Sequence, residues 1–130
     1  MADSLHMELV AADRTVWSGE ANMVIARTTE GDIGVLPNHA PTLSLMVDGV
    51  VEVNTAEGEI WVAAVDAGFL SVADNRVSIL SEHAEMSHEI DLEKARQDLE
   101  RAQASGENDD AAQEAVRRAE ARVRAVERAS

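Results

Sequence analysis

The spacing of apolar residues changes abruptly near Asp91. Before this point, apolar and polar residues alternate in short runs, so that Leu5, Met7 and Leu9 would share one face of a β-strand. After it, apolar residues recur every three to four positions, as they do in an amphipathic helix. The sequence therefore predicts an α+β fold arranged by segments, with a β part followed by a helical part.

The β part is expected to contain many short strands. The alternation recurs at Met23 and Ile25, at Val51 and Val53, and at Ile60, Val62 and Ala64. Turn signals separate the runs at Ser18-Gly19, Asp48-Gly49, Glu57-Gly58 and Asp74-Asn75, and the last of these joins a hairpin from about Gly68 to Leu80. Because aromatic residues make up only 2% of the chain, the core must be built from aliphatic side chains and Met. Regularly spaced short strands of this kind predict a sandwich or a flattened barrel.

The helical part is expected to hold two helices. Their apolar stripes are Leu92, Ala95, Leu99 and Ala102 in the first, and Ala112, Val116, Ala119, Val123 and Val126 in the second. Between them, the sequence Ser105-Gly-Glu-Asn-Asp interrupts a helix. Two helices with such a short connection form an antiparallel hairpin. We place the domain boundary between residues 88 and 89, which gives a β-sandwich domain at 1–88 and a helical hairpin domain at 89–130.

The hairpin is expected to be held weakly by its own contacts. Its stripes are mostly Ala and Val, and burial at ~25 cal/mol per Å² stabilises such a seam little beyond the entropy lost in ordering it. Isolated helices of this length are marginal in water. The hairpin should therefore depend on the β domain, a partner or a ligand. This dependence suits a conformational switch, and it suits a dispensable tail equally well.

Composition excludes several classes of partner and site. The formal net charge of −14 disfavours binding to nucleic acid or anionic lipid. The charge is uneven, since residues 1–90 hold 15 acidic residues against three arginines (−12), whereas residues 91–130 hold ten against eight basic residues (−2).

The absence of cysteine rules out disulfides and thiolate metal sites, and is typical of a reducing compartment. No apolar run approaches the ~20 residues that cross a bilayer, and the N-terminus shows no export signal. We expect a cytoplasmic protein that meets a membrane only through a partner.

No catalytic or metal site is predicted. The four histidines, His6, His39, His83 and His88, are scattered, and no nucleophile, metalloprotease or phosphate-loop motif occurs. The acidic residues follow no calcium-loop pattern.

The segment Glu30–Pro41 (EGDIGVLPNHAP) crowds two glycines, two prolines and a histidine between strand-like runs. Such a segment cannot be helical, because proline removes a donor, while Gly31 and Gly34 permit positive φ or close backbone approach. Its residues are consistent with a shaped turn, and equally with a contact loop that a rigid β scaffold holds in place.

The second predicted helix carries a basic cluster. Arg118 and Arg122 lie four residues apart on one face, and Arg117, Arg124 and Arg128 lie nearby. Arginines at this spacing can grip a phosphate group through their fork geometry. Alternatively, they can pair with glutamates at helical spacing, which contributes only ~0.2–0.5 kcal/mol per pair.

Over its whole length the chain resembles the epsilon subunit of bacterial F-type (rotary) ATP synthases. The resemblance rests on Gly31, Gly34, Pro37, His39, Ala40 and Pro41 in the loop, and on Val16-Trp-Ser-Gly, Asp66-Ala-Gly-Phe-Leu and Arg122-Val-Arg-Ala-Val-Glu elsewhere. It implies a ten-stranded β sandwich followed by an antiparallel two-helix hairpin. It also implies a non-catalytic rotor subunit of the central stalk, peripheral on the cytoplasmic face of the bacterial cell membrane and without direct membrane insertion.

The resemblance further implies protein partners. In the family the sandwich packs on the gamma subunit and touches the c-ring, and the matching contact residue is Asp32, with His39 close by in the same loop. The hairpin either folds on the sandwich or extends along gamma toward the alpha/beta catalytic head, where it restrains ATP hydrolysis. Such a subunit couples proton-driven c-ring rotation to ATP synthesis.

Some family members bind ATP in the folded hairpin through an Ile/Leu-Asp-x-x-Arg-Ala motif. Here the motif reads Ile90-Asp91-Leu-Glu-Lys94-Ala95, and the other matching positions are Glu85, Arg118 and Arg122. Lys94 keeps the charge of the arginine that it replaces but lacks the planar fork. The resemblance therefore implies no required cofactor, and ATP only as a weak regulatory ligand.

The alternative hypothesis is a stand-alone nucleotide-sensing module whose hairpin closes over a nucleotide without a rotary partner. Copurification separates the two hypotheses, because a sensor would run alone and a rotor subunit would run with gamma.

Overall fold

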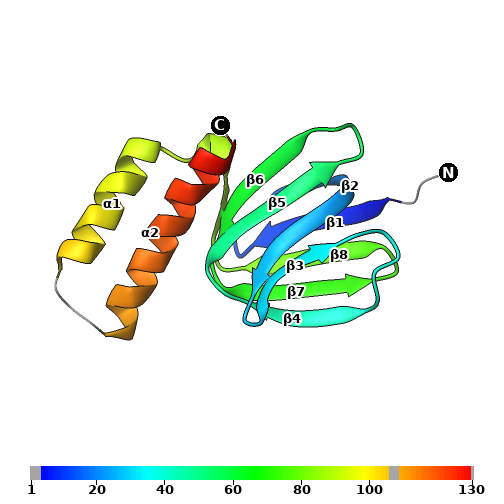
Figure 1. Cartoon of the computed structure of the whole chain (residues 1–130), viewed down its shortest axis with the longest axis horizontal. Coiled ribbons are helices and arrows are strands. Elements are labelled where there is room, and N and C mark those ends of the chain that lie inside the picture. Colours follow the sequence, from blue (N-terminus) through cyan, green and yellow to red (C-terminus); the bar gives the residue numbers. More distant parts are fainter. Residues whose placement is uncertain (1–3, 106–108, 130) are drawn as a thin grey trace.

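The structure is a computed structural model that describes residues 4–105 and 109–129. A β domain lies beside a helical hairpin, and helix α2 lies between helix α1 and the β domain (Figure 1). The elements are β1 (Leu5–Ala11), β2 (Thr15–Thr28), β3 (Gly31–Val35), β4 (Thr42–Met46), β5 (Gly49–Thr55), β6 (Ile60–Val65), β7 (Gly68–Ala73), β8 (Arg76–Ser81), β9 (Ala84–Met86), the 3-10 turn η1 (Ser87–Glu89), α1 (Leu92–Ala104) and α2 (Asp110–Ala129).

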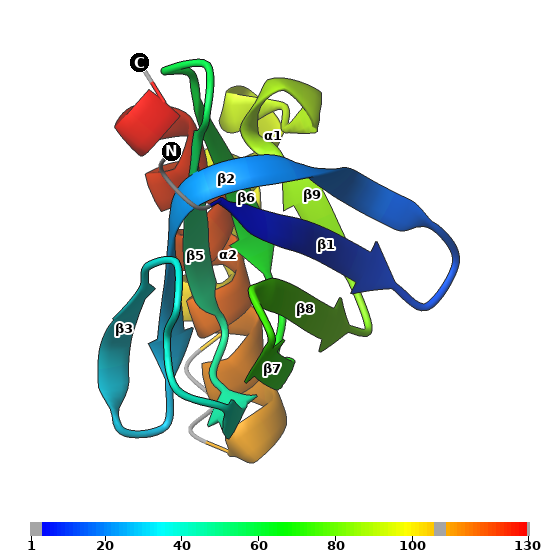
Figure 2. The same ribbon diagram turned by 90° about the vertical axis from the view of Figure 1, so that its right-hand side faces the viewer.

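The long strand β2 connects the two layers of the β domain. Its first half pairs with β1, and its second half pairs with β3 and β5. Strand β1 also pairs in parallel with β8, and the pairings β8–β7–β4 lead back to β2, so these five strands form a closed ring. The second layer continues from β2 through β5 and β6 to β9 (Figure 2). The sandwich followed by a two-helix hairpin is confirmed, with nine strands in the described residues where ten were expected.

Aliphatic side chains fill the core, as the composition predicts. Leu5, Met7 and Leu9 of β1 are buried, and so are alternate residues of β5, β7 and β8. The predicted β7–β8 hairpin forms, and Asp74 and Asn75 in its turn both have positive φ. The strands of this hairpin are in close contact at Gly68, where a Cβ would lie 1.9 Å from the carbonyl oxygen of Leu80.

In the second half of β2, the apolar alternation at Met23 and Ile25 does not mark the buried face. Met23 and Ile25 are only half-buried, whereas Val24, Ala26 and Thr28 are buried. The pairing of β2 with β5 shifts register between Ala21 and Met23. An extra residue at such a bulge exchanges the two faces of a strand, so the inward positions change from odd to even numbers.

The segment Glu30–Pro41 is a loop only in part. Residues 31–35 form β3, which pairs with β2, and the irregular loop begins at Leu36. Gly31 has a φ of +113°, as its place in the β2–β3 turn requires. Gly34 has neither a positive φ nor an atom within 4 Å of a Cβ position, so the expectation for this glycine is wrong.

The hairpin docks on the sandwich through α2. Ala121 and Ala125 are buried against Val62 and Ala64 of β6, in a small apolar cluster that is separate from the sandwich core. The alternation in β6 therefore places Val62 and Ala64 toward the helix, while Ile60 is exposed. Ala95 of α1 and Ala119 of α2, each in a predicted stripe, are also buried.

Candidate functional site

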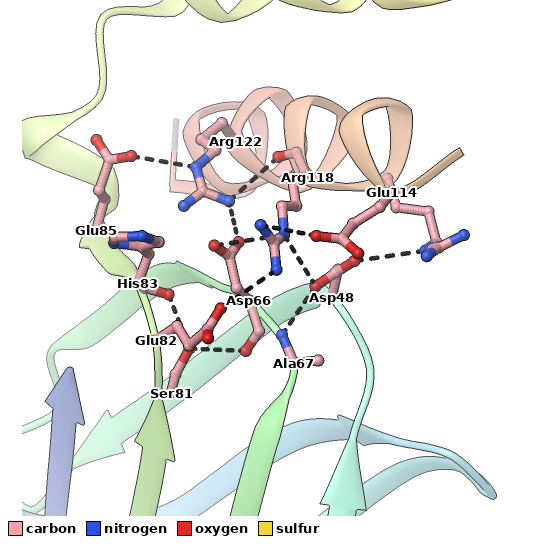
Figure 3. Close-up of polar contacts among 11 residues, drawn as sticks. Asp48, Asp66, Ala67, Ser81, Glu82, His83, Glu85, Glu114, Arg118 and Arg122 are labelled. Atoms are coloured by element: carbon pink, nitrogen blue, oxygen red, sulfur yellow. Dashed lines mark hydrogen bonds and ion pairs between the residues drawn. The ribbon is translucent and has the colours of Figure 1, made fainter. Parts of the chain in front are cut away.

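Arg122 of α2 reaches across the interface to two carboxylates of the β domain. Its Nη1 lies 2.6 Å from Oδ1 of Asp66, and its Nε donates to Oε1 of Glu85 at 3.1 Å (Figure 3). Asp66 follows β6 directly and is 2% exposed, while the Arg122 side chain is 15% exposed. Charge-assisted contacts of this kind are stronger than neutral hydrogen bonds, and burial reduces their screening by salt.

Arg118, one turn earlier on α2, extends this arrangement. Its Nε lies 3.5 Å from Asp66 and 3.6 Å from Asp48, and its Nη1 lies 2.9 Å from Glu114. The Nε atom is buried and makes no hydrogen bond among the described residues, because both carboxylate distances exceed hydrogen-bonding range. We call Arg118 and Arg122, together with Asp48, Asp66 and Glu85, the interdomain ion-pair network.

The sandwich holds the carboxylates of this network in place. The backbone amide of Ala67 donates to Oδ1 of Asp48 at 2.8 Å, so the loop before β5 is tied to the loop after β6. The hydroxyl of Ser81 donates to the carbonyl oxygen of Asp66 at 2.8 Å. The acceptors are therefore positioned before the helix arrives, which lowers the entropy lost on docking.

Burial alone would lower the pKa of Arg122, but the hydrogen bond and charge of Asp66, together with those of Glu85, outweigh burial and raise that pKa above its ordinary value. Arg122 is thus a permanent cation in the folded hairpin. Removing it would leave Asp66 as a buried carboxylate without its closest partner.

The residues that match the family's ATP motif gather round one pocket. Glu85, Ile90, Asp91, Lys94, Ala95 and Arg122 all line it, whereas Arg118 lines a neighbouring pocket. The first pocket has a volume of about 110 Å³, compared with ~300–1,000 Å³ for typical small-molecule sites. This pocket is small for a nucleotide while the hairpin is folded as it is here.

Several of these residues also have structural contacts of their own. Asp91 is the N-cap of α1, where its side chain accepts from the amide of Lys94 at 3.2 Å. Lys94 pairs with Asp98 at 3.0 Å, and Ile90 packs against the small apolar cluster under α2. Each contact stabilises the folded hairpin without a ligand.

The two expected c-ring contacts lie at opposite ends of β3. Asp32 lies on β3 beside the β2–β3 turn, whereas His39 lies in the loop that follows the strand. The expectation that they share a loop is therefore wrong, because Asp32 lies within a strand and His39 lies beyond its end. Arg27 donates to Asp32 at 3.0 Å and lowers the pKa of that exposed carboxyl, so Asp32 is ionised at neutral pH.

The sequence reasoning missed an apolar surface on the other layer of the sandwich. The exposed fractions of Leu43, Leu45, Phe69 and Leu80 are 74%, 55%, 50% and 52%. Leu45 of β4 is opposite Phe69 of β7, and Phe69 is opposite Leu80 of β8, so three large side chains form a row across the sheet. The consecutive pairs Phe69-Leu70 and Ile79-Leu80 were the available signal, since only one member of each pair can face the core.

No helix in residues 4–105 and 109–129 is both long and apolar enough to cross a bilayer. Within the same ranges, no group of three or more histidine and acidic side chains is arranged to hold a metal ion.

Comparison with known proteins identifies relatives along the whole chain. Residues 4–87 match the family described as ATP synthase, Delta/Epsilon chain, beta-sandwich domain. The ATP synthase epsilon chain of Streptomyces avermitilis is 56% identical over 97% of this chain and 98% of its own length. That of Rhodococcus opacus is 50% identical over 95% and 96%, respectively.

Solved structures are also similar. A chain of the Euglena gracilis mitochondrial ATP synthase, from an OSCP/F1/c-ring assembly, superposes with a TM-score of 0.78 at 29% identity, covering 97% of this chain and 81% of that one. A chain from the central stalk and c-ring of the Tetrahymena thermophila enzyme shares the fold, with a TM-score of 0.60 at 15% identity and coverage of 98% and 97%. With the matched sandwich and the near full-length relatives, this chain belongs to the ATP synthase epsilon chain family.

Proposed function

We propose that this chain is a non-catalytic rotor subunit of a proton-translocating F-type ATP synthase, in which it couples c-ring rotation to ATP synthesis. The sandwich would bind the gamma subunit and touch the c-ring at the cytoplasmic face of the bacterial membrane. The helices would restrain ATP hydrolysis when they extend toward the alpha/beta head.

The observation that carries this proposal is the apolar row of Leu45, Phe69 and Leu80, with Leu43 beside it. Leu45, Phe69 and Leu80 each have a buried neighbour in their strand, and Leu43 lies two residues before Leu45 on the same face, so all four point away from the core. Adjacent large apolar side chains on an otherwise acidic surface mark a protein interface, because their exposure to water is unfavourable. The hairpin packs on β5 and β6, and so leaves this row available for a partner.

The test is binding of the full chain to purified gamma subunit. Phe69→Glu should weaken binding by more than ~10-fold, because a charge would be buried at the centre of the interface. Ile60→Glu is a matched control, since Ile60 is 59% exposed at the start of β6 and lies outside the row. The assignment of this surface to gamma would be contradicted if both variants lost binding equally, or if neither variant lost binding.

The restraint of hydrolysis needs the hairpin to leave the sandwich. Its docking rests on two buried alanines and the interdomain ion-pair network, and such contacts can be exchanged for contacts elsewhere. The ATP hydrolysis rate of an epsilon-depleted head with gamma, measured with and without the full chain, tests this part. An unchanged rate despite binding would make the chain a coupling clamp without a braking role.

ATP as a weak regulatory ligand stays a prediction. In the folded hairpin a triphosphate would have to displace Asp66 and Glu85 from Arg122, and Asp98 from Lys94. The small pocket does not favour the stand-alone sensor, and copurification with gamma would exclude it.

A further inference from the structure

A second and larger groove lies between α2 and the sandwich, apart from the ATP-motif pocket. Its volume is about 550 Å³, within the usual range for small-molecule sites. The sandwich contributes Arg27, Met46, Val47, Asp48 and Ala67, and α2 contributes Arg117, Glu120 and Arg124. Of these residues, only Asp48 belongs to the interdomain ion-pair network.

Three guanidinium groups from two domains converge on this groove. Arg27 comes from β2. Its aliphatic side-chain atoms cross β5 at Gly49, where a Cβ would lie 3.3 Å from the Cβ and Cδ of Arg27. Arg117 and Arg124 are seven residues apart on α2, which places them on one face of the helix. The lining also holds two carboxylates, Asp48 and Glu120, and Arg27 pairs with Asp32. The arginines at this groove therefore equal the nearby carboxylates in number, in a chain whose net charge is −14.

The carboxylates nearby use only part of the donor capacity of these arginines. Asp32 accepts from Nε of Arg27, and Asp48 faces Nε of Arg117 at 3.4 Å. Glu120 accepts from one terminal nitrogen of Arg124 at 3.2 Å. Because a guanidinium carries five N–H donors, each arginine keeps capacity for a further acceptor.

The groove also offers apolar surface, from Met46, Val47 and Ala67. A ligand that satisfies the whole groove therefore needs an anionic end and an apolar body. A phosphate group suits the anionic end better than a carboxylate does, because its three free oxygens can accept from more than one guanidinium fork.

We propose that this groove binds a small organic phosphate, whose phosphate group contacts Arg27, Arg117 and Arg124 while its body lies on Met46 and Val47. The ligand bridges α2 and the sandwich, so it stabilises the folded hairpin by mass action. The regulatory consequence, that such a ligand delays extension of the hairpin, rests on the proposed function. Binding itself does not.

The experiment is an NMR titration of the full chain with phenyl phosphate and, separately, with inorganic phosphate. Saturable amide shifts centred on Arg27, Met46–Asp48 and residues 117–124 are expected, with tighter binding of phenyl phosphate. Arg124→Gln should weaken binding about 10-fold, since it removes a charge-assisted hydrogen bond. Arg101→Gln is the control, because Arg101 is 77% exposed on α1 and pairs with Asp98. Amide shifts of the ligand-free variants report whether they fold.

Three outcomes would overturn the proposal. In the first, Arg124→Gln binds phenyl phosphate as tightly as the unmodified chain does. In the second, no saturable shifts occur. In the third, Lys94→Gln alone abolishes binding, which assigns the ligand to the ATP-motif pocket. A separate experiment measures cosedimentation of the chain with phosphatidylglycerol vesicles. If the chain binds these vesicles through Arg124 but does not bind phenyl phosphate, the site belongs to a lipid headgroup. Gamma binding, which tests the proposed function, is measured separately. Failure of the phosphate site is therefore distinguishable from failure of the proposed function.

Discussion

The sandwich and the hairpin of this chain are stabilised by different contacts. A continuous cluster of aliphatic side chains, in which Leu5, Leu70 and Ile79 are 0% exposed, holds the sandwich together. The hairpin contributes Ala121 and Ala125 to a small cluster and otherwise docks through ion pairs. Two alanines bury little area, so the charged contacts decide whether the hairpin stays.

This difference makes the two regions separable. A large apolar core unfolds cooperatively, whereas an ion pair can be exchanged for another ion pair or for water. The uneven charge of the sequence has its explanation here, since α2 presents arginines to carboxylates of the sandwich, among them Asp48, Asp66 and Glu85. We expect hairpin docking to respond to single charge changes that leave the sandwich intact.

The largest effect is expected for Arg122→Ala. Loss of this side chain leaves Asp66 buried without its closest partner, which costs up to about 3 kcal/mol of docking free energy. The helix can then leave the sandwich and expose Asp66 to water. Hydrogen exchange should accelerate in α2 while the strands stay protected.

Arg101→Ala serves as the matched control for this prediction. Its side chain is 77% exposed, and it contacts Asp98 on its own helix. If α2 stays protected in Arg122→Ala, or if the strands lose protection to the same extent, the separation of the two regions is wrong.

A smaller effect is expected for Ala125→Leu. Ala125 is 0% exposed where α2 meets β6, and a larger side chain there forces the helix outward at a cost of about 1–3 kcal/mol. Ala115→Leu is the control, since Ala115 is exposed on the same helix. Thermal unfolding followed in the strands should be unchanged in both variants, and α2 exchange should accelerate only in Ala125→Leu.

The sequence predicted which segments form strands and helices better than it predicted which face of each element is exposed. The alternation in β1 and the two helical stripes identified a strand-rich part with an aliphatic core and a two-helix hairpin correctly. The predicted stripe of the second helix did not include Ala121 and Ala125, which dock on β6. The bulge in β2 was not predictable, because the shift between Ala21 and Met23 depends on the register with β5 rather than on local sequence.

The arginines of the interdomain ion-pair network were predicted to lie together, but the pairing of these arginines with Asp48 and Asp66 was not. The spacing of Arg118 and Arg122 indicated a shared face, but both alternatives in the sequence reasoning, phosphate and helical glutamates, left out carboxylates from another domain. Asp48 and Asp66 follow different strands, and only the pairing of β5 with β6 brings them together under α2. A single sequence does not contain that pairing.

The smallest effect is expected at the junction of the two regions, where Arg14 of the β1–β2 turn donates to Glu89 of η1 at 3.0 Å. That hydrogen bond, and then the one from the Met86 amide, lowers the pKa of Glu89 below its ordinary value. Because the fold favours the ionised form, the stabilisation is fully present above the unfolded pKa of about 4.3, and is lost as the pH falls through the lower folded pKa.

Glu89→Gln should therefore differ from the unmodified chain near neutral pH and converge with it in acid. Trp61 is a suitable reporter, since its ring meets that of His88 in η1 edge-on at a centroid distance of 5.8 Å. Its fluorescence during thermal unfolding, in a Trp17→Phe background, should show a shift that shrinks below about pH 4.3. A shift that stays constant across the acid range would mean that Glu89 acts by packing. Solvent screening keeps this effect small, because the Glu89 side chain is 33% exposed, so the junction contributes less to docking than Arg122 does.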